Sequence, residues 1–293
     1  MIENIFSQIL DQKREGIAKL RADPFSRNLR KRALEIRKDA DPHQLLRALL
    51  GRPGCGVQSA QRVDPTLKII AEFKRRSPSA GIIRDELTVG DVVRWYERAG
   101  ACAISILTDE QYFGGSIADL SAARVSTRLP LLRKDFIIDP IQVFEAAIAG
   151  ADAVLLIVAA LDDDSLSELR ALAEDHLGLD AVIEIHTSEE LHRALTAGAK
   201  IIGVNNRDLK TFQVSLTTSE HLIAEAPRDR ILISESGLQN ADALNRLRNL
   251  GFRGFLIGEA LMRTANPETA LRDWIAAGKC QQPAAVFTES CQR

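Results

Sequence analysis

The chain has 293 residues, 45% of them hydrophobic and 27% charged, and its formal net charge at pH 7 is −2. A charge so close to zero gives no reason to expect nucleic acid or an anionic membrane surface as a partner. No apolar run approaches the roughly 18 residues of a membrane-spanning helix. Neither a nucleic-acid-binding protein nor a membrane protein is therefore predicted.

The cysteines and the N-terminus both indicate a cytoplasmic protein. The four cysteines are scattered and form no CxxC pair, so they predict neither a zinc site nor a disulfide framework. Cys102 opens an apolar run and is expected in the core. The first residues, MIENIFSQILDQKREG, carry acidic residues early and have no long apolar segment, unlike a signal peptide.

Residues 1–64 are predicted to form a helical extension and a linker. Apolar residues follow helical spacing at positions 2–10 and again at 45–50. The basic run RNLRKRALEIRK at 27–38 is either an arm that attracts phosphate or the solvated face of a helix. We favour the helix face, because the run has no aromatic residues. Residues 51–64 are rich in glycine and polar residues, which is typical of a linker.

Eight short apolar runs alternate with segments of helical periodicity from residue 65 to residue 277. The runs lie at 69–74, 103–108, 129–134, 153–158, 181–185, 201–205, 231–235 and 252–258. A glycine stands just before every second run, at Gly100, Gly150, Gly198 and Gly251, where a helix would end. This pattern predicts an α/β fold, a single (β/α)8 TIM barrel with an N-terminal helical extension. Residues 278–293 are expected to be a disordered tail.

Three of the predicted helices have recognisable starts. Asp139 precedes Pro140, and Asn266 precedes Pro267, which places proline in a first helical turn. Thr187 supplies a capping hydroxyl before two acidic residues.

Glu72 and Lys74 lie two positions apart at the end of the first run, so both side chains point to the same face of a strand. They form either an internal salt bridge or a carboxylate and an ammonium that share a functional pocket. Charge inside a barrel is costly unless it is paired or functional, and lysine and glutamate recur at other strand ends, so we favour function. The polar loop at 75–79 is suited to closing over an anionic ligand.

Lys134 and Glu184 end or interrupt two further runs. Held near other cations, Lys134 would have a lowered pKa and would donate a proton to a substrate oxygen; the alternative is an ordinary solvent-exposed lysine. Glu184 is expected inside the barrel, where burial would raise its pKa and suit it to acid or base chemistry. Its structural alternative is a salt bridge to Lys134 or Lys74. His186 is expected to make a structural contact rather than to catalyse.

Two glycine-containing loops follow the last two runs, SESG at 234–237 and IGEA at 257–260. Phosphate sites of TIM barrels are often built by the loops after strands seven and eight, and the loops are otherwise simple tight turns. A small phosphorylated substrate is therefore predicted. No metal-ligand cluster, GxGxxG or GxxxxGK[ST] motif occurs, so no metal or nucleotide cofactor is expected.

The sequence resembles the indole-3-glycerol-phosphate synthase family over about residues 66–275. The resemblance is carried by IIAEFKRRSPS, ISILTDEQYFGGS, LPLLRKDFIIDPIQ, AVIEIH, IIGVNNRDLKTF, ILISESG and GFLIGEALM, in this order. The family also places a helical extension before its barrel. Arg76 and Ala80 stand where lysine is found in family members, which we expect to affect loop closure alone.

The resemblance implies a carbon–carbon lyase of tryptophan biosynthesis without a cofactor. Its substrate is 1-(2-carboxyphenylamino)-1-deoxyribulose 5-phosphate, and its products are indole-3-glycerol phosphate, carbon dioxide and water. Lys134 would stabilise the ketone oxygen, Lys74 would bind the ring carboxylate, and Glu184 would be the base. The remaining acid is either Lys74 or Glu72.

The resemblance also assigns the other site residues. Asn205 and Glu235 would hold sugar hydroxyls or orient the lysines. The further substrate contacts are Ser77, Phe113, Arg207, Ser236, Gly237, Gly258 and Glu259. Phe113 would lie on the aromatic ring, and the last four would hold the phosphate, mainly through backbone N–H groups.

Two other functions remain open at this point: another phosphosugar-binding barrel enzyme, such as phosphoribosylanthranilate isomerase, or a non-catalytic phosphosugar-binding barrel. An isomerase needs one acid and one base rather than two lysines and three glutamates, and a non-catalytic barrel should have lost one of these groups. The expected assembly is a monomer or a weak homodimer, with transient contact to other enzymes of tryptophan synthesis.

Overall fold

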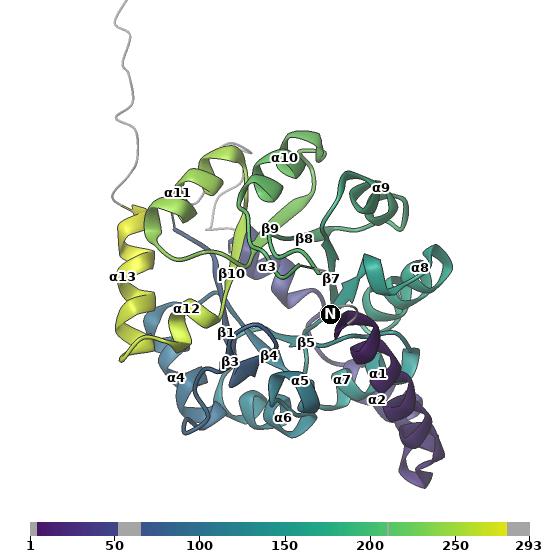
Figure 1. The fold of residues 1–293 in the computed structure, drawn as a ribbon. Coiled ribbons are helices and arrows are strands. Elements are labelled where there is room, and N and C mark those ends of the chain that lie inside the picture. Colours follow the sequence, from purple (N-terminus) through teal and green to yellow (C-terminus); the bar gives the residue numbers. More distant parts are fainter. Residues whose placement is uncertain (1–4, 52–65, 210, 280–293) are drawn as a thin grey trace, which may run out of the picture.

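Eight parallel strands close into a barrel in the computed structural model, which describes residues 5–51, 66–209 and 211–279 (Figure 1). Around the barrel the strands follow the order β1, β10, β9, β8, β7, β6, β5, β4. They are β1 Ile69–Phe73, β4 Ala103–Leu107, β5 Leu131–Lys134, β6 Ala153–Ile157, β7 Asp180–Ile185, β8 Ile201–Asn205, β9 Ile231–Glu235 and β10 Gly254–Ile257. The predicted TIM barrel is confirmed, and each strand coincides with one of the eight apolar runs.

Helices follow each strand and form the outer ring seen in Figure 1. They are α4 Val89–Ala99, α5 Glu110–Phe113, α6 Ile117–Ser126, α7 Pro140–Ile148, α8 Asp163–Ala171, α9 Ser188–Thr196, α10 Thr217–Glu225, α11 Ala241–Leu250, α12 Glu259–Met262 and α13 Pro267–Lys279, with a short 3-10 helix, η2 Val158–Ala160, and a π-helical segment, η3 Leu172–His176. The predicted caps are confirmed: Asp139, Thr187 and Asn266 each accept a backbone N–H from the first turn of the helix that follows. The glycines predicted to end helices all have positive φ, a conformation that glycine adopts without steric cost.

Two apolar layers hold the barrel together. Residues that point outward from the strands, such as Ile183 and Ile185, pack against the surrounding helices. Residues that point inward, such as Val182, fill the barrel interior together with Leu45 and Leu49. The last two belong to α3 (Gln44–Leu50), so this helix closes the end of the barrel opposite the strand C-termini.

The N-terminal segment wraps the barrel from one end to the other. Helix α1 (Ile5–Ala22) begins over the barrel mouth, and η1 (Pro24–Asn28) leads to α2 (Leu29–Arg37), which lies beside α7 (Figure 1). In the basic run at 27–38 only Leu29 and Ala33 are buried, which confirms its interpretation as a solvated helix face. Its last helical residue, Arg37, donates to the carbonyl oxygens of Leu177 and Gly178 and so attaches α2 to the barrel.

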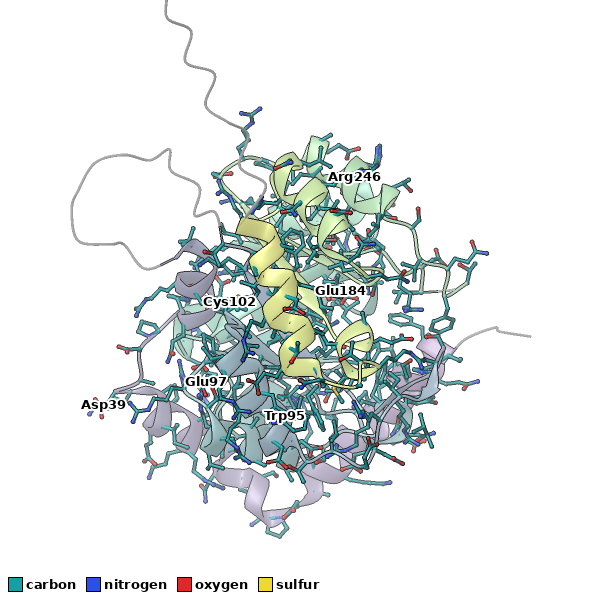
Figure 2. All side chains as sticks on the ribbon, turned by 90° about the vertical axis from the view of Figure 1, so that its left-hand side faces the viewer. Asp39, Trp95, Glu97, Cys102, Glu184 and Arg246 are labelled. Carbon is teal, nitrogen blue, oxygen red and sulfur yellow. The ribbon has the colours of Figure 1, made fainter. Side chains whose placement is uncertain are left out.

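Some details were not predicted. The loop after β1 contains a short antiparallel hairpin, β2 (Arg76–Ser77) with β3 (Gly81–Ile82). Cys102 precedes β4 and is half-buried, packed against the apolar side chains of the barrel interior, so the expectation of a core position holds in part. In Figure 2 it lies toward the opposite end of the barrel from Glu184.

The remaining expectations concern the ends of the extension and of the chain. Helix α13 includes residues 278 and 279, so the first two residues of the expected tail are helical. The rest of the tail and nearly all of the expected linker lie outside the described residues. Within the described ranges, no helix is both long enough and apolar enough to cross a membrane.

Candidate active site

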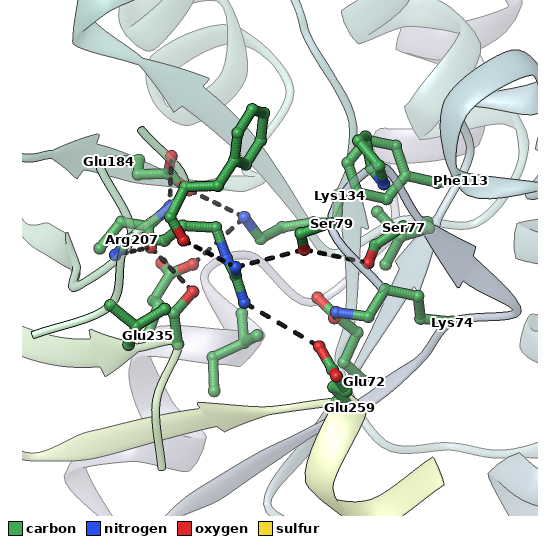
Figure 3. Close-up of a pocket in the computed structure, with 18 of the residues that line it drawn as sticks. Glu72, Lys74, Ser77, Ser79, Phe113, Lys134, Glu184, Arg207, Glu235 and Glu259 are labelled. Atoms are coloured by element: carbon green, nitrogen blue, oxygen red, sulfur yellow. Dashed lines mark hydrogen bonds and ion pairs between the residues drawn. The ribbon is translucent and has the colours of Figure 1, made fainter. Parts of the chain in front are cut away.

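A cavity of about 500 Å³ opens at the C-terminal ends of the strands (Figure 3). This volume is typical of sites that hold a small molecule. All thirteen site residues predicted from the sequence line it: Glu72, Lys74, Ser77, Phe113, Lys134, Glu184, Asn205, Arg207, Glu235, Ser236, Gly237, Gly258 and Glu259. The structure thus brings together residues from the ends of five strands, β1, β5, β7, β8 and β9, and from the segments that follow the strands.

Lys134 lies between two carboxylates (Figure 3). Its Nζ is 2.8 Å from Oε2 of Glu184 and 3.2 Å from Oε2 of Glu235. Burial alone would lower the pKa of Lys134, but Glu184, Glu235 and Glu72 outweigh burial and raise it. The expectation that nearby cations would lower this pKa was therefore wrong: the neighbours are anions, and Lys134 is a firmly charged ammonium.

Glu184 is fixed from both sides. Lys134 contacts its Oε2, and the side-chain amide of Asn205 donates to its Oε1 at 3.1 Å. Burial alone would raise the pKa of Glu184, but the charges of Lys134 and His186 and these two hydrogen bonds lower it. The position inside the barrel was predicted correctly and the direction of the pKa shift was not, since Glu184 is ionised at neutral pH.

Glu235 is the carboxylate whose pKa rises. Burial and the nearby charges of Glu184 and Glu72 raise the pKa of Glu235 to about 7, and Lys134 only partly offsets them. Its Oε1 lies against Gly203 on β8, where a Cβ atom would come within 2.2 Å. The cavity holds a cluster of two lysines, Lys74 and Lys134, and three glutamates, Glu72, Glu184 and Glu235. This cluster is electrically neutral when one of the three carboxylates is protonated. Glu235 holds that proton most readily, because its pKa is raised.

Replacing Glu235 with glutamine should stabilise the protein relative to the parent increasingly as the pH rises from 4.5 to 7. A raised pKa in the folded state stabilises the fold below the unfolded-state pKa, and this contribution is lost as the pH rises through the folded-state pKa. A shift from 4.5 to about 7 corresponds to about 3 kcal/mol. Denaturant unfolding at several pH values measures the difference. Glu189→Gln, on the exposed face of α9, is the control, and a difference independent of pH would contradict the assignment.

Glu72 and Lys74 form an ion pair of 2.8 Å on the opposite wall of the cavity. Ser105 of β4 donates to the other carboxylate oxygen of Glu72 at 3.5 Å. Gly258 lies against the same side chain, and a Cβ at this position would come within 2.3 Å of Oε1 of Glu72. Gly258 thus has a role that the sequence did not indicate, because it leaves space for Glu72.

The loop after β1 covers part of the cavity, but its two arginines point away from it. Arg75 forms a bidentate pair with Asp119, and Arg76 donates to backbone carbonyls of α5. Ser79 is the loop residue that reaches across, since its hydroxyl accepts from Arg207 at 3.2 Å. The loop that was predicted to close over a ligand is therefore held at two places. Its arginines attach it to α5 and α6, which follow β4, and Ser79 attaches it to Arg207, which follows β8.

The predicted phosphate loops lie on the same side of the cavity. Ser236 and Gly237 have successive positive φ values of 66° and 75°. The Ser236 hydroxyl donates to Oδ1 of Asn205 at 2.9 Å, so it is oriented by the residue that also holds Glu184. Glu259 is paired with Arg263 at 3.0 Å and lies 3.9 Å from Arg207, which places two cations beside these loops.

An aromatic wall lines the cavity and was only partly predicted. The ring of Phe136 lies 6.3 Å from that of Phe113 and 6.1 Å from that of Phe6, which belongs to α1. Phe136 follows Lys134 by two positions, a spacing that can bring it to the same face. No local pattern indicates Phe6, whose helix reaches the cavity only through the tertiary fold.

Lys13 attaches α1 to this region and was also not predicted. Its Nζ lies 2.8 Å from Asp109 and 2.6 Å from Asp135, and both carboxylates are almost fully buried. Asp109 caps α5, which carries Phe113, and Asp135 directly follows Lys134. Despite the opposing effect of burial, Arg133 and Lys13 lower the pKa of Asp135 to about 2.

Replacing Lys13 with methionine should lower the free energy of unfolding by about 3 to 5 kcal/mol, because it removes the cation from the buried carboxylate of Asp109 and leaves Asp135 with Arg133 alone among the described residues. Arg14→Met is the matched control, since Arg14 is exposed on the same helix and pairs only with its neighbour Asp11 among the described residues. Denaturant unfolding of the three proteins gives the comparison. Equal losses in the two variants would contradict the proposed attachment, and Asp109→Asn should restore part of the loss in Lys13→Met.

Comparison with known proteins gives a consistent result. The sequence matches the family model described as indole-3-glycerol phosphate synthase over residues 6–274. A protein of that name from Bacteroides thetaiotaomicron is 41% identical over 276 residues, which cover 94% of this chain and 99% of that protein. Another from Polaromonas sp. is 40% identical over 271 residues, which cover 92% and 97%.

Solved structures with similar folds are more distant in sequence. Thiamine phosphate pyrophosphorylase from Pyrococcus furiosus aligns with a TM-score of 0.56 at 18% identity, covering 73% of this chain and 96% of that one. KGPDC from Streptococcus mutans aligns with a TM-score of 0.54 at 15% identity, covering 73% and 98%. At such identities these structures support the barrel fold alone.

Proposed function

The chain belongs to the indole-3-glycerol phosphate synthase family, and from this membership we propose how its cavity residues divide the work of that reaction. The enzyme is a carboxy-lyase of tryptophan biosynthesis that closes the indole ring, releases carbon dioxide and removes water. These steps require a donor at the ketone oxygen, a cation at the ring carboxylate, an acid and a base.

Lys134 is the donor at the ketone oxygen. When the ring carbon attacks the ketone, this oxygen becomes an alkoxide, which is basic enough to take a proton even from an ammonium whose pKa is raised. The contacts to Glu184 and Glu235 support this role, because they keep Lys134 charged and hold its Nζ in place before the substrate arrives. A prearranged charge of this kind stabilises the transition state without reorganisation.

Lys74 binds the ring carboxylate until it leaves as carbon dioxide. Its position supports this role, because it faces the cavity from the wall opposite Glu184 and is paired with Glu72 alone among the described residues. For the dehydration, Glu184 takes the proton that the newly formed five-membered ring loses. The hydroxyl leaves with a proton from either Lys74 or Glu72, which lie 2.8 Å apart.

The substrate phosphate binds between the loops at 236–237 and 258–259. Arg207 and Arg263 beside these loops supply positive charge, and the backbone turn at Ser236 and Gly237 exposes N–H groups. The carboxyphenyl ring lies against Phe113 and Phe136. Asn205 orients both Glu184 and Ser236, while Ser77 and Ser79 line the loop over the substrate.

The arrangement of Lys134 between Glu184 and Glu235 carries the proposal, and one assay tests it. Purified protein is mixed with 1-(2-carboxyphenylamino)-1-deoxyribulose 5-phosphate, and indole fluorescence is followed. We expect the fluorescence to appear with the parent protein and to be lost with Lys134→Met. A folded parent protein that binds this substrate without forming the indole product would refute the assignment.

We further propose a cytoplasmic protein that is a monomer or a weak homodimer and contacts other enzymes of tryptophan synthesis transiently. The free thiol of Cys102 is compatible with a reducing compartment. Among the described residues, the exposed large apolar side chains are spread over several elements, with Leu34 and Ile36 together on α2 and Ile82, Val125 and Leu250 each on another, and this spread disfavours a large permanent interface. Light scattering across a concentration series tests the assembly.

A further inference from the structure

His186 lies directly behind Glu184, outside the cavity. It follows the last residue of β7 and precedes Thr187, the cap of α9. It is not among the residues that line the cavity, and its side chain is 11% exposed. The imidazole therefore has no direct access to a substrate, and any effect on the reaction must pass through a neighbour.

The imidazole is held between two carboxylates. On one side, Nδ1 lies 3.2 Å from Oε2 of Glu190, which also accepts the backbone N–H of His186 at 2.6 Å. On the other side, Nε2 lies 3.6 Å from Oε1 of Glu184. These two contacts with Glu190 fix the ring so that Nε2 points toward the active site.

Nε2 of His186 is buried and has no hydrogen-bond partner among the described residues. A buried polar nitrogen in this situation normally finds an acceptor, and Oε1 of Glu184 lies only slightly beyond hydrogen-bond distance. A small rotation of the ring would close the gap. Because Glu184 also moves a proton in the proposed reaction, this contact has a consequence for catalysis.

The charged groups that face His186 come from three elements besides its own segment. Glu184 lies on β7, Glu190 on α9, and Glu235 more distantly on β9; Lys134 of β5 lies on the far side of Glu184. Burial alone would lower the pKa of His186, but the bond to Glu190 and the three carboxylates raise it. The ring therefore stays protonated to a higher pH than a free imidazole.

Glu184 consequently has a protonatable nitrogen close to each oxygen, Lys134 and His186, whereas Glu235 has Lys134 alone among the described residues. We propose that His186 is a positioning residue that keeps Glu184 ionised, so that the single proton shared by the carboxylate cluster resides on Glu235. This inference rests on the proposed role of Glu184 as the proton acceptor. Without the imidazolium, Glu184 would keep Lys134 and the Asn205 amide but would lose its second cation, so the two carboxylates would compete more evenly for the proton.

The test is the pH dependence of kcat in His186→Gln, which removes the charge but keeps a polar side chain. We expect the acid limb of the profile to move to higher pH by about one unit, since a cation near a carboxylate lowers its pKa by at least that much. Near pH 8 the variant should recover the parent rate, and KM should change little. His192→Gln, the same change at an exposed position of α9, should leave the profile unmoved.

A second measurement detects the protonation of the carboxyl groups directly. Infrared titration of the carboxyl carbonyl band should show one group protonating at higher pH in His186→Gln than in the parent, and this change should disappear in the double variant with Glu184→Gln. If His186→Gln does not fold, Glu190→Gln should move the acid limb in the same direction, because the ring would lose the carboxylate that orients it.

The outcomes separate this inference from the proposed function. A uniform loss of kcat at all pH values, or an unmoved acid limb and an unmoved carbonyl band, would mean that His186 only caps α9, and would overturn the inference. A parent protein that forms no indole product would instead refute the proposed function, while the infrared titration would still decide whether His186 controls Glu184.

Discussion

Replacing Lys134 with methionine is expected to lower kcat by a factor of about 10² or more, because a positioned acid typically contributes that much. Methionine fills a similar volume but cannot donate to the ketone oxygen. Substrate affinity should change far less, since the loops at 236–237 and 258–259, Lys74 and the aromatic wall remain. Steady-state kcat and KM, with folding checked by circular dichroism, measure the effect.

A second substitution at the same position separates charge from proton transfer. Lys134→Arg keeps a cation beside Glu184 and Glu235, so it should preserve folding and binding better than methionine does. A guanidinium does not release its proton under these conditions, so turnover should stay low. If Lys134→Met retained kcat within tenfold of the parent, the donor role would be wrong, and Lys74 would be the remaining candidate.

The fold was predictable because its signals are local. Each strand is a short apolar run bounded by a polar residue, and many of the helices that follow the strands begin with their own capping side chain, as α7 does with Asp139 before Pro140. The side chains at strand ends were predictable for the same reason. In a parallel barrel all C-terminal ends meet at one face, so Lys134 and Glu184 had to approach each other although they lie 50 positions apart.

The electrostatics of the site were not predictable in this way. The sign of the pKa shift of Glu184 depends on which groups surround it, and burial alone indicated the wrong direction. The same holds for Lys13, whose partners Asp109 and Asp135 are far along the chain and become neighbours only when α1 lies over the barrel mouth. The role of Gly258 in leaving space for Glu72 could not be predicted either, because it depends on where the Glu72 side chain lies.

Replacing Glu184 with glutamine is the sharpest test of the base. The amide has the same shape and can still bond to Asn205, but it cannot accept a proton, so kcat should fall by a factor of about 10² or more while KM stays within a few-fold of the parent. The lowered pKa of Glu184 means that the parent is already ionised at neutral pH, so the loss should persist across the neutral range. Measuring kcat and KM between pH 6 and 9 checks both points.

Glu235→Gln is the matched comparison, since both glutamates contact the same Nζ of Lys134. If Glu184 is the base, Glu235→Gln should retain much more activity than Glu184→Gln, because an amide resembles the protonated carboxyl group that Glu235 carries below about pH 7. The reverse order of activities would identify Glu235 as the base. In that case its pKa near neutrality, rather than the ionised state of Glu184, would set the pH dependence of turnover, because a base works best when its pKa lies near the working pH.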